Sequence, residues 1–336
     1  MATQTMTAAI LDAPGGTFRI ASAPRPEPRA GEALVRIAAS GVNPLDSKIR
    51  RGEAPHARQP LPAILGIDLA GIVEAVGPGV TDLRPGDEVY GAAGGVGGHQ
   101  GTLAEYAAVD ARLLARKPAS LSMREAAALP LIFITAWEGL VDRAGVREGQ
   151  KVLVHGGAGG VGHVAIQIAR AFGAEAFATG SGANAGVISQ LGATPIDYRS
   201  DAVEHYVANF TGGRGFDIVY DTVGGATLDA SFQAVRRFGH VVSALGWGSH
   251  ALAPLSFRAA SYSGVFTLLP LLTGEGRAHH GEILAEATRL TEAGKIRPRV
   301  DPQRFALADA MEAHRASESG SAAGKLVVEI EPKAAT

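Results

Sequence analysis

The alternation of apolar and polar positions is most informative between residues 151 and 172. The apolar run from Val152 to Val154 predicts a buried strand. After a glycine-rich turn, apolar residues recur at the spacing of one helix face, at Val161, Val164, Ala165, Ile168, Ala169 and Phe172. The pattern therefore predicts a strand, a tight turn and a helix in direct succession.

The chain changes character near Pro130. About the first 125 residues contain short β-branched runs between Gly- and Pro-rich turns, with strand candidates at 33–38, 70–76 and 88–90. From Pro130 onward, helical periodicity alternates with strand candidates at 151–154, 175–179, 194–196, 217–220 and 240–245. The first pattern predicts a β-rich, barrel-like domain, and the second predicts an α/β fold with a doubly wound sheet.

A helix is expected at 228–238, between the last two of these strands. Beyond Leu269 the pattern predicts a helix at 282–293 and strand-like segments that include 325–330. We expect this tail to return to the first domain. The expected domains are 1–127, 128–268 and the returning segment 269–336.

The turn after the first α/β strand has the spacing Gly157-x-Gly159-x-x-Gly162, with Ala158, Gly160 and Val161 between the glycines. Between a strand and a helix, such glycines permit a tight turn and let the backbone approach a pyrophosphate at the helix N-terminus. These six residues are the expected cradle for a dinucleotide. The other glycine-rich run, 94–98, lacks the third glycine and is interpreted as a flexible surface loop.

The loop after the second strand bears on the choice of cofactor. An NAD site has an acidic residue here that holds the ribose 2′-hydroxyl, but no Asp or Glu lies between Ala176 and Ser189. The small hydroxyl residues Thr179 and Ser181 leave room for a 2′-phosphate, with Tyr198 and Arg199 available from the next strand, so NADPH is favoured. The loop contains no Lys or Arg, so NADH remains possible, and each residue is equally consistent with an ordinary surface turn.

Bulk properties exclude several function classes. The formal net charge is −2 with no basic run, which argues against nucleic-acid binding. No apolar stretch is long enough to span a membrane and no signal peptide is evident, so a cytoplasmic location is expected. The chain has no cysteine, which removes disulfides, thiolate catalysis and cysteine-based zinc sites.

The chain resembles the medium-chain dehydrogenase/reductase superfamily, most closely its zinc-independent quinone oxidoreductase (zeta-crystallin-like) and enone reductase branch. The resemblance extends over nearly the whole sequence. Besides the glycine fingerprint it rests on segments 40–46 (SGVNPLD), 65–71 (LGIDLAG), 84–91 (RPGDEVYG), 102–106 (TLAEY), 135–137 (TAW), 196–198 (IDY), 221–225 (DTVGG) and 324–328 (GKLVV). It implies a Rossmann domain and a GroES-like β-barrel catalytic domain built from both chain ends.

The resemblance also bears on metal binding. Zinc alcohol dehydrogenases of this fold hold catalytic zinc with Cys, His (or an acid) and Cys, and the matching positions are Asn43, Ile67 and Leu131. These residues cannot form the tetrahedral set, so no zinc is expected. His99 is a formal remaining candidate, although a solvated loop histidine is the plainer interpretation.

The resemblance implies roles for further residues. Asn43 is expected beside the nicotinamide and its ribose, although Asn43-Pro44 is equally a turn signal. Thr135 is expected near the carboxamide, or as a helix N-cap. Backbone contacts around the nicotinamide are expected from Leu245, Gly246 and Trp247.

Lys48 stands where typical bacterial quinone reductases carry a tyrosine, and the run 43–48 resembles the plant-type enone and alkenal reductase pattern. Lys48 is a candidate to orient a carbonyl or a phosphate, or to donate a proton through water. The alternative is a surface lysine paired with Asp46 or Glu53.

Without a Lewis acid, reduction of an activated acceptor requires less help than alcohol oxidation. We therefore expect an NADPH-dependent, zinc-free reductase of a quinone or an α,β-unsaturated carbonyl. The alternatives are a zinc-dependent alcohol dehydrogenase and a non-enzymatic nucleotide-binding protein of the same fold. By resemblance a homodimer is expected, with candidate interfaces at 239–245 and 261–272.

Overall fold

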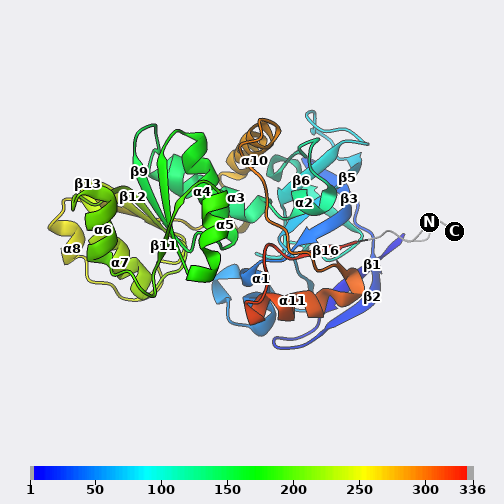
Figure 1. Ribbon diagram of the computed structural model, residues 1–336. Helices are drawn as coiled ribbons and strands as arrows, with labels where there is room; N and C mark the ends of the chain where they lie inside the picture. Colours follow the sequence, from blue (N-terminus) through cyan, green and yellow to red (C-terminus); the bar gives the residue numbers. More distant parts are fainter. Residues whose placement is uncertain (1–3, 331–336) are drawn as a thin grey trace. The chain divides into compact units, whose positions relative to one another are not determined.

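The computed structural model describes residues 4–330, which divide into two compact units (Figure 1). Unit 1 contains residues up to 131 together with 268–293 and the segment from 298 onward. Unit 2 contains 132–267 and the short segment 294–297. The last segment returns to unit 2 although it lies within the C-terminal region of the chain.

Unit 2 is built on a six-stranded, fully parallel sheet with the order β11-β10-β9-β12-β13-β14. Its strands are β9 (Lys151–His155), β10 (Glu175–Gly180), β11 (Thr194–Asp197), β12 (Phe216–Asp221), β13 (Val235–Ser243) and β14 (Ser261–Gly264). The order grows outward in both directions from β9, so the chain changes winding direction between β9 and β12. This is the doubly wound fold expected, and ligands of such sheets bind beyond the carboxyl ends of the strands at the change of direction.

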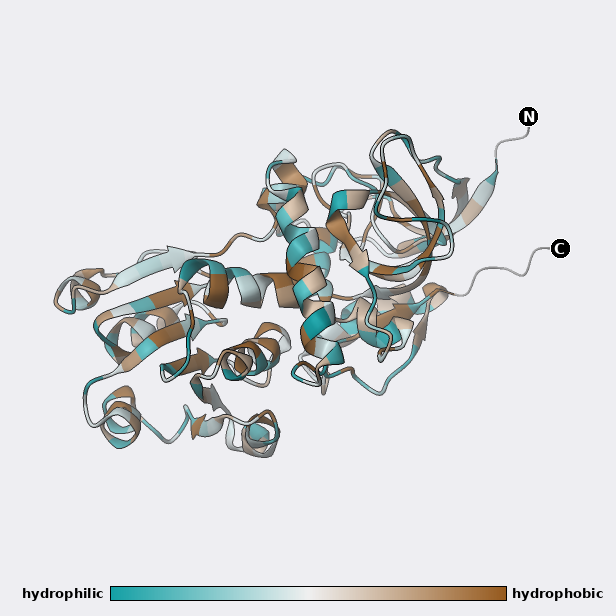
Figure 2. Ribbon diagram, turned by 90° about the horizontal axis from the view of Figure 1, so that it is seen from above, coloured by the Kyte–Doolittle hydropathy of each residue, from teal (hydrophilic) through white to brown (hydrophobic). Residues whose placement is uncertain are grey.

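Helices connect these strands. They are α4 (Gly160–Ala171), α5 (Ala185–Gln190), α6 (Val203–Thr211), α7 (Ala226–Ala234) and α8 (Ala253–Ser256), preceded by α3 (Pro130–Trp137) and the π-helix η3 (Glu138–Arg143), with the short 3₁₀ turn η4 (Gly182–Asn184). On one face of the sheet, α6 and α7 pack against each other. Hydrophilic and hydrophobic segments alternate along the helices in Figure 2, as expected for helices that cover a core with one side.

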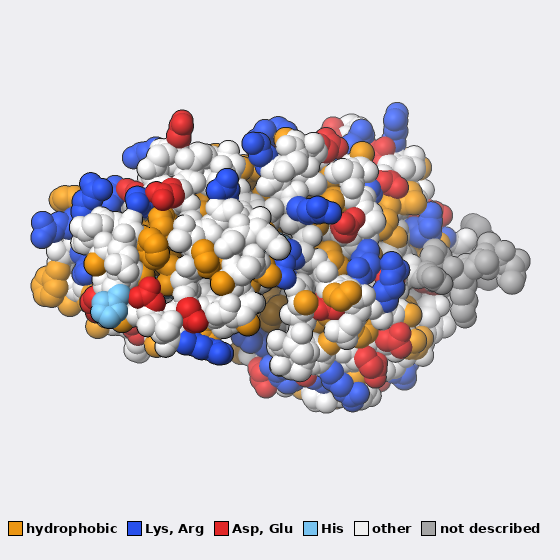
Figure 3. Space-filling view, viewed as in Figure 1, with side chains coloured by type: hydrophobic (Ala, Val, Ile, Leu, Met, Phe, Trp, Pro, Cys, Tyr) orange, Lys and Arg blue, Asp and Glu red, His pale blue; other side chains and the backbone are white. Residues whose placement is uncertain are grey.

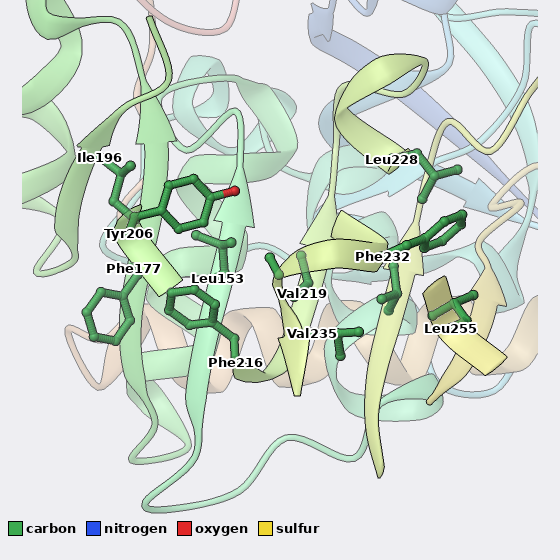
Figure 4. Packing of buried hydrophobic residues seen from close by; sticks show 12 residues of the cluster. Leu153, Phe177, Ile196, Tyr206, Phe216, Val219, Leu228, Phe232, Val235 and Leu255 are labelled. Atoms are coloured by element: carbon green, nitrogen blue, oxygen red, sulfur yellow. The ribbon is translucent and has the colours of Figure 1, made fainter. Parts of the chain in front are cut away.

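The core beneath α6 and α7 joins side chains from every inner strand (Figure 4). Leu153 of β9 lies among aromatic side chains, and the rings of Phe177 and Phe216 meet edge to face at 5.3 Å. Tyr206 of α6 and Phe232 of α7 close the cluster, and both are at most 2% exposed. The close packing of these buried side chains makes the sheet rigid, and a rigid sheet fixes the positions of the loops at its carboxyl edge.

The helix expected at 228–238 ends earlier. In the structure α7 stops at Ala234, and Val235 begins β13 by pairing with Phe216. The register shifts after this pair, and Phe238 adopts a left-handed φ of 58°. The apolar spacing of 228–238 is compatible with a helix, but the β-branched Val235 pairs with β12 and packs into the core of the sheet. The strand expected at 240–245 correspondingly ends at Ser243.

Unit 1 contains two sheets. A three-stranded sheet has the order β2-β1-β4, from β2 (Phe18–Pro24), β1 (Thr5–Leu11) and β4 (Ala63–Ile64). A seven-stranded sheet contains β3 (Glu32–Gly41), β5 (Asp68–Val76), β6 (Glu88–Ala92), β7 (Tyr106–Asp110), β8 (Leu114–Arg116), β15 (Phe305–Ala306) and β16 (Val327–Glu329). Because β16 pairs antiparallel with β3, the C-terminal region completes a sheet begun by the N-terminal region.

The helices of unit 1 are short except for α10. They are α1 (Pro44–Arg51), α2 (Met123–Ala127), α9 (Leu269–Thr273), α10 (Arg277–Glu292) and α11 (Ala310–Ser319), with the 3₁₀ turns η1 (Pro55–Ala57), η2 (Ala111–Leu113) and η5 (Leu307–Asp309). Within residues 4–330, no helix is long and apolar enough to cross a membrane. Positive and negative side chains are interspersed on the face shown in Figure 3.

The glycine run 94–98 is not simply a surface loop. Gly94 and Gly95 are buried, and a Cβ on Gly95 would lie 2.5 Å from the Gly66 carbonyl oxygen. Only Gly97 and Gly98 are exposed. These glycines allow close backbone packing inside unit 1, which the sequence pattern alone did not indicate.

Candidate active site

The glycine turn of unit 2 has a distinct use for each glycine. Gly156, which lies outside the recognised spacing, makes the left-handed turn with φ 74°. A Cβ on Gly157 would lie 2.5 Å from the Ala178 Cβ, and one on Gly162 would overlap the Gly156 carbonyl. By contrast, a Cβ on Gly159 would meet only the Gly156 oxygen, at 3.2 Å. Gly157 and Gly162 therefore permit strand–helix packing, while Gly159 keeps an open backbone face.

That open face coincides with the beginning of α4. Gly159 is the N-cap with an extended backbone, and Gly160 and Val161 form the first helical turn. The first N–H groups of a helix have no intrahelical acceptor and carry the positive end of its dipole. A pyrophosphate fits this cradle, since a side chain at Gly159 would occupy the path to it. The six residues expected to bind the dinucleotide thus lie together at the carboxyl end of β9.

Thr179, at the end of β10, supports the turn from within. Its hydroxyl accepts a hydrogen bond from the Gly156 N–H at 3.2 Å and lies 3.0 Å from His155 Nδ1. Its carbonyl accepts from the Gly157 N–H at 2.9 Å. Burial lowers the pKa of His155 to about 4, with Asp221 acting in the opposite direction. At neutral pH the site therefore contains a neutral imidazole beneath the turn, and Thr179 is 4% exposed.

A carboxylate from the next strand lies beside the loop that follows β10. Asp197, the last residue of β11, lies so close that a Cβ on Gly182 would be 2.9 Å from its Oδ2. Its Oδ1 accepts the Arg199 N–H at 3.0 Å. Ser181 is half-buried, whereas Tyr198 is 58% exposed with the Arg199 guanidinium 5.8 Å from its ring centre. Sequence reasoning examined only the second strand for an acid and missed Asp197, although it stands in the segment Ile196–Tyr198.

Residues after β13 gather at the same edge of the sheet. The Asp221 carboxylate, at the end of β12, accepts the Ser243 hydroxyl at 2.7 Å, and that hydroxyl accepts the Leu245 N–H at 3.0 Å. Gly246 lies against the Tyr262 hydroxyl, where a Cβ would overlap it. Trp247 is 56% exposed and meets Phe266 edge to face. The structure thus fixes the start of segment 245–247 through a buried carboxylate.

Thr135 is not a helix N-cap, because it lies inside α3. Its hydroxyl is 3.0 Å from that of Thr267, and its carbonyl accepts the Tyr220 hydroxyl at 2.6 Å. The side chain is 9% exposed. Thr135 is therefore held by hydrogen bonds within unit 2, and its expected contact with a carboxamide remains a prediction.

Unit 1 contains a buried polar cluster that begins at Asn43, the N-cap of α1. The Asn43 Oδ1 accepts from Lys325 Nζ at 2.6 Å, and its Nδ2 donates to Asp68 Oδ2 at 2.9 Å. Its backbone N–H donates to Asp46 Oδ2 at 2.8 Å. Asn43, Asp46 and Asp68 are at most 1% exposed and Lys325 is 6% exposed. The turn expected at Asn43-Pro44 is thus the start of a helix, and its side chain is fixed by charged groups from β5 and the C-terminal region.

Burial dominates the ionisation of this cluster. It raises the pKa of Asp46 to about 7 and that of Asp68 to about 6. It lowers the pKa of Lys325, and the two carboxylates oppose that change. The Asp46 Oδ1 has no hydrogen-bond partner. The cluster therefore contains one cation and two acids, and burial opposes the ionisation of both acids, that of Asp46 more strongly.

Lys48 lies apart from this cluster, on the exposed side of α1. Of the two suggested partners, Asp46 accepts the Asn43 backbone N–H instead. Glu53 binds the Arg51 guanidinium at 2.7 Å, although the charge of Lys48 also helps to lower the pKa of Glu53. An exposed ammonium at this place is compatible with a ligand contact, which remains a prediction.

The positions that correspond to zinc ligands do not fit zinc. Ile67 and Leu131 are buried hydrocarbons, and the Asn43 oxygen already accepts from the ammonium of Lys325. A cation bound there would therefore lie against the Lys325 ammonium, and the nearby carboxylates of Asp46 and Asp68 already accept hydrogen bonds from Asn43. His99 Nε2 lies 3.0 Å from the Arg277 guanidinium. Within the described residues, no group of three or more His, Cys, Asp or Glu side chains could hold a metal ion.

Comparison with known proteins gives the relationship of the chain. Residues 29–119 match the alcohol dehydrogenase GroES-like domain, and residues 191–328 match a family described as zinc-binding dehydrogenase. The 2-methylene-furan-3-one reductase of Solanum lycopersicum is 37% identical over 90% of this chain and 73% of its own length. The chloroplastic NADPH-dependent alkenal/one oxidoreductase of Arabidopsis thaliana is 35% identical over the same shares. The chain belongs to the medium-chain dehydrogenase/reductase superfamily.

Within this superfamily, solved structures agree with the fold. An alcohol dehydrogenase superfamily protein from Novosphingobium aromaticivorans is 60% identical, with a TM-score of 0.96 over 97% of this chain and all of that one. A mycobacterial quinone oxidoreductase is 31% identical with a TM-score of 0.84, covering 96% and 99%. The expected Rossmann and GroES-like architecture in the quinone and enone reductase branch is confirmed, and the protein is an oxidoreductase of this type.

Some relatives are much longer. The spectinabilin polyketide synthase system protein NorB of Streptomyces orinoci is 36% identical over 96% of this chain, but the chain spans only 14% of its length. A sequence of this kind therefore also occurs within a much longer protein.

Proposed function

We propose that the protein is a reductase that uses NADPH, without zinc, to reduce a quinone or an α,β-unsaturated carbonyl. The observation that carries the proposal is the chemistry of the three positions that correspond to zinc ligands. Two are hydrocarbon, and the third, Asn43, is hydrogen-bonded to an internal ammonium. Such residues do not offer the ligands for a metal that would stabilise an alkoxide, but they can supply hydrogen bonds to a conjugated acceptor.

The residues have separate tasks in this proposal. The cradle from Gly157 to Gly162 holds the pyrophosphate, and Leu245, Gly246 and Trp247 supply backbone contacts near the nicotinamide. The bound cofactor supplies the hydride. Asn43, Lys48 and Thr135 orient the nicotinamide, its ribose or the acceptor, so that negative charge on the acceptor oxygen meets hydrogen-bond donors.

The preference for NADPH has support from both the comparisons and the loop. The Arabidopsis relative is described as NADPH-dependent, β10 ends without an acid, and Arg199 and Tyr198 are exposed beside the loop. Asp197 opposes this preference, because a carboxylate near the ribose repels a 2′-phosphate. Fluorescence titration should give tighter binding of NADPH than NADH, and equal or reversed affinities would contradict the preference.

A panel of quinones and conjugated enones tests the reaction. Oxidation of NADPH at 340 nm should require an acceptor and should survive prior treatment with a zinc chelator. Stoichiometric zinc in elemental analysis, with activity lost to chelator, would favour an alcohol dehydrogenase instead. Cofactor binding with no turnover on any acceptor would favour a non-enzymatic binding protein.

Assembly and location stay predictions. We propose a homodimer joined through β14, which pairs with β13 at the end of the six-stranded sheet. Light scattering coupled to size exclusion should give twice the 34.5 kDa chain mass. A cytoplasmic location is proposed from the sequence alone.

A further inference from the structure

Four of the sequence segments that mark the family converge on one buried place in unit 1. Segment 40–46 supplies Asn43 and Asp46, segment 65–71 supplies Asp68, and segment 324–328 supplies Lys325. Segment 102–106 supplies Thr102, whose hydroxyl donates to the Asp68 carbonyl at 3.0 Å. The roles proposed above use only Asn43, so the remaining members need an explanation.

The hydrogen bonds define the orientation of the Asn43 amide. An ammonium is only a donor and an ionised carboxylate is only an acceptor. The Asn43 oxygen must therefore face Lys325 and its nitrogen must face Asp68, at the observed 2.6 and 2.9 Å. The reversed amide would place N–H against ammonium and oxygen against carboxylate. We call this arrangement the Asn43 bridge: Lys325 ammonium, Asn43 amide and Asp68 carboxylate.

Both ends of the bridge are fixed by the backbone. Lys325 Nζ also donates to the Val42 carbonyl at 2.8 Å, and its own backbone is bonded to Arg299 and Asp301. Asp68 Oδ1 accepts the Leu131 N–H at 2.9 Å. Because these side chains are almost fully buried, the amide has little freedom to turn.

The bridge also changes the amide electronically. A cation on the oxygen draws electron density from the nitrogen, and hydrogen bonds in a chain strengthen one another in a low-dielectric interior. The Nδ2 group has two hydrogens, of which Asp68 takes one. The second is held in one direction and is a better donor than that of an isolated amide.

Resting on the proposed function, we propose that Lys325 and Asp68 are positioning residues that orient and polarise Asn43, so that its second N–H donates to the oxygen of the conjugated acceptor as negative charge develops there. Hydride adds to the conjugated carbon, the electron pair moves to that oxygen, and a proton from water completes the reduction. Lys325 thereby places a positive charge behind the amide.

A double-mutant cycle tests this proposal, with Asn43→Ala, Lys325→Met and the double variant. Lys325→Met keeps a side chain of similar length but removes the charge, and it should lower kcat/KM about 10- to 100-fold, the range for loss of a charged hydrogen bond. Lys325→Arg should recover part of this loss. In the Asn43→Ala background, Lys325→Met should lower kcat/KM less than about 3-fold, because Lys325 acts on the reaction only by orienting and polarising Asn43.

Lys117→Met is the matched control. Lys117 is a half-buried lysine of unit 1, with its side chain 5% exposed; its ammonium lies 3.1 Å from Glu88 Oε2 and donates to the carbonyls of Pro118 and Leu121. Its replacement should lower thermal stability and leave kcat/KM within about 2-fold of the wild type, as expected for a residue remote from the chemistry. NADPH affinity, measured by fluorescence, should stay unchanged in Lys325→Met and in the control.

The outcomes separate the two proposals. If wild-type protein reduces none of the acceptors, the proposed function is overturned and the catalytic role of the bridge with it. If the wild type is active but Lys325→Met keeps full kcat/KM, the bridge alone is overturned. The same holds if Lys325→Met lowers kcat/KM by the same factor in the wild-type and Asn43→Ala backgrounds. The bridge is supported if Lys325→Met lowers kcat/KM without changing NADPH affinity, if this loss disappears in the Asn43→Ala background, and if Lys325→Arg restores part of the activity.

Discussion

Two glycines in the turn after β9 should respond differently to the same added methyl group. At Gly162 a Cβ would overlap the Gly156 oxygen and lie 2.8 Å from the Gly156 carbonyl carbon and 2.9 Å from the Gly157 Cα. Ordinary contact begins near 3.4 Å, so α4 and the turn must separate by at least about 0.5 Å. All three atoms are backbone and cannot rotate away. We expect Gly162→Ala to lower the free energy of unfolding by about 1–3 kcal/mol, as overpacking does.

At Gly159 the methyl group meets one oxygen at 3.2 Å, and the backbone is already extended with φ −75°. Gly159→Ala should therefore change the free energy of unfolding by less than about 0.5 kcal/mol. The methyl group would nevertheless stand where a pyrophosphate approaches, so NADPH affinity should fall at least about 10-fold. Urea unfolding without cofactor and fluorescence titration with NADPH measure the two effects separately.

Gly186→Ala in α5 is the control, because a Cβ there meets nothing within 4 Å. It should keep wild-type affinity and gain up to about 1 kcal/mol in stability. Wild-type NADPH affinity in a folded Gly159→Ala variant would show that the open backbone face is not the phosphate site. Unchanged stability in Gly162→Ala would refute the packing argument.

Three further substitutions test charges in the two units. Asp197→Asn should raise NADPH affinity relative to NADH, because it removes a carboxylate beside the loop that we propose receives the ribose. Paired titrations measure the ratio of the two affinities, and an unchanged ratio would contradict this role. Arg199→Ala should lower affinity for NADPH more than for NADH, since only the former carries the 2′-phosphate. Burial lowers the pKa of His314 to about 4, so the folded state keeps it neutral while the unfolded chain binds a proton below about 6.5. The free energy of unfolding should consequently fall as the pH drops from 8 to 5, by about 2 kcal/mol more in the wild type than in His314→Asn. Urea unfolding at the two pH values measures this difference, and an equal fall in both proteins would contradict it.

The parts predicted well from sequence are those in which one local pattern determines both structure and chemistry. The run from 151 to 172 predicted a strand, a turn and a helix because apolar spacing and glycine spacing agree over adjacent residues. Even there the left-handed residue is Gly156, which the recognised spacing omits. Its φ is set by the geometry of strand and helix, and the sequence offered no separate sign of it.

The parts that escaped sequence reasoning depend on contacts between distant segments. Asp197 lies beside Gly182 because β11 pairs with β10, a pairing that no local pattern specifies. The helix expected at 228–238 ended early because Val235 joined the sheet. Lys325 lies 282 residues from Asn43 along the chain and still donates to it at 2.6 Å. The tail was expected to rejoin the first domain, but its lysine had no predicted partner.

The Asn43 bridge is hard to explain as a device for stability. Removing charges from water costs several kcal/mol per ion, and buried ion clusters are often no more stabilising than hydrocarbons of equal volume. Here Asp46 even retains an oxygen without a partner, which adds to that cost. A hydrocarbon core at this place, continuous with the buried side chains of Ile67 and Leu131, would avoid the penalty. The arrangement is better explained by its effect on Asn43: a cation on one side and a carboxylate on the other fix an amide that neutral neighbours would leave free to rotate.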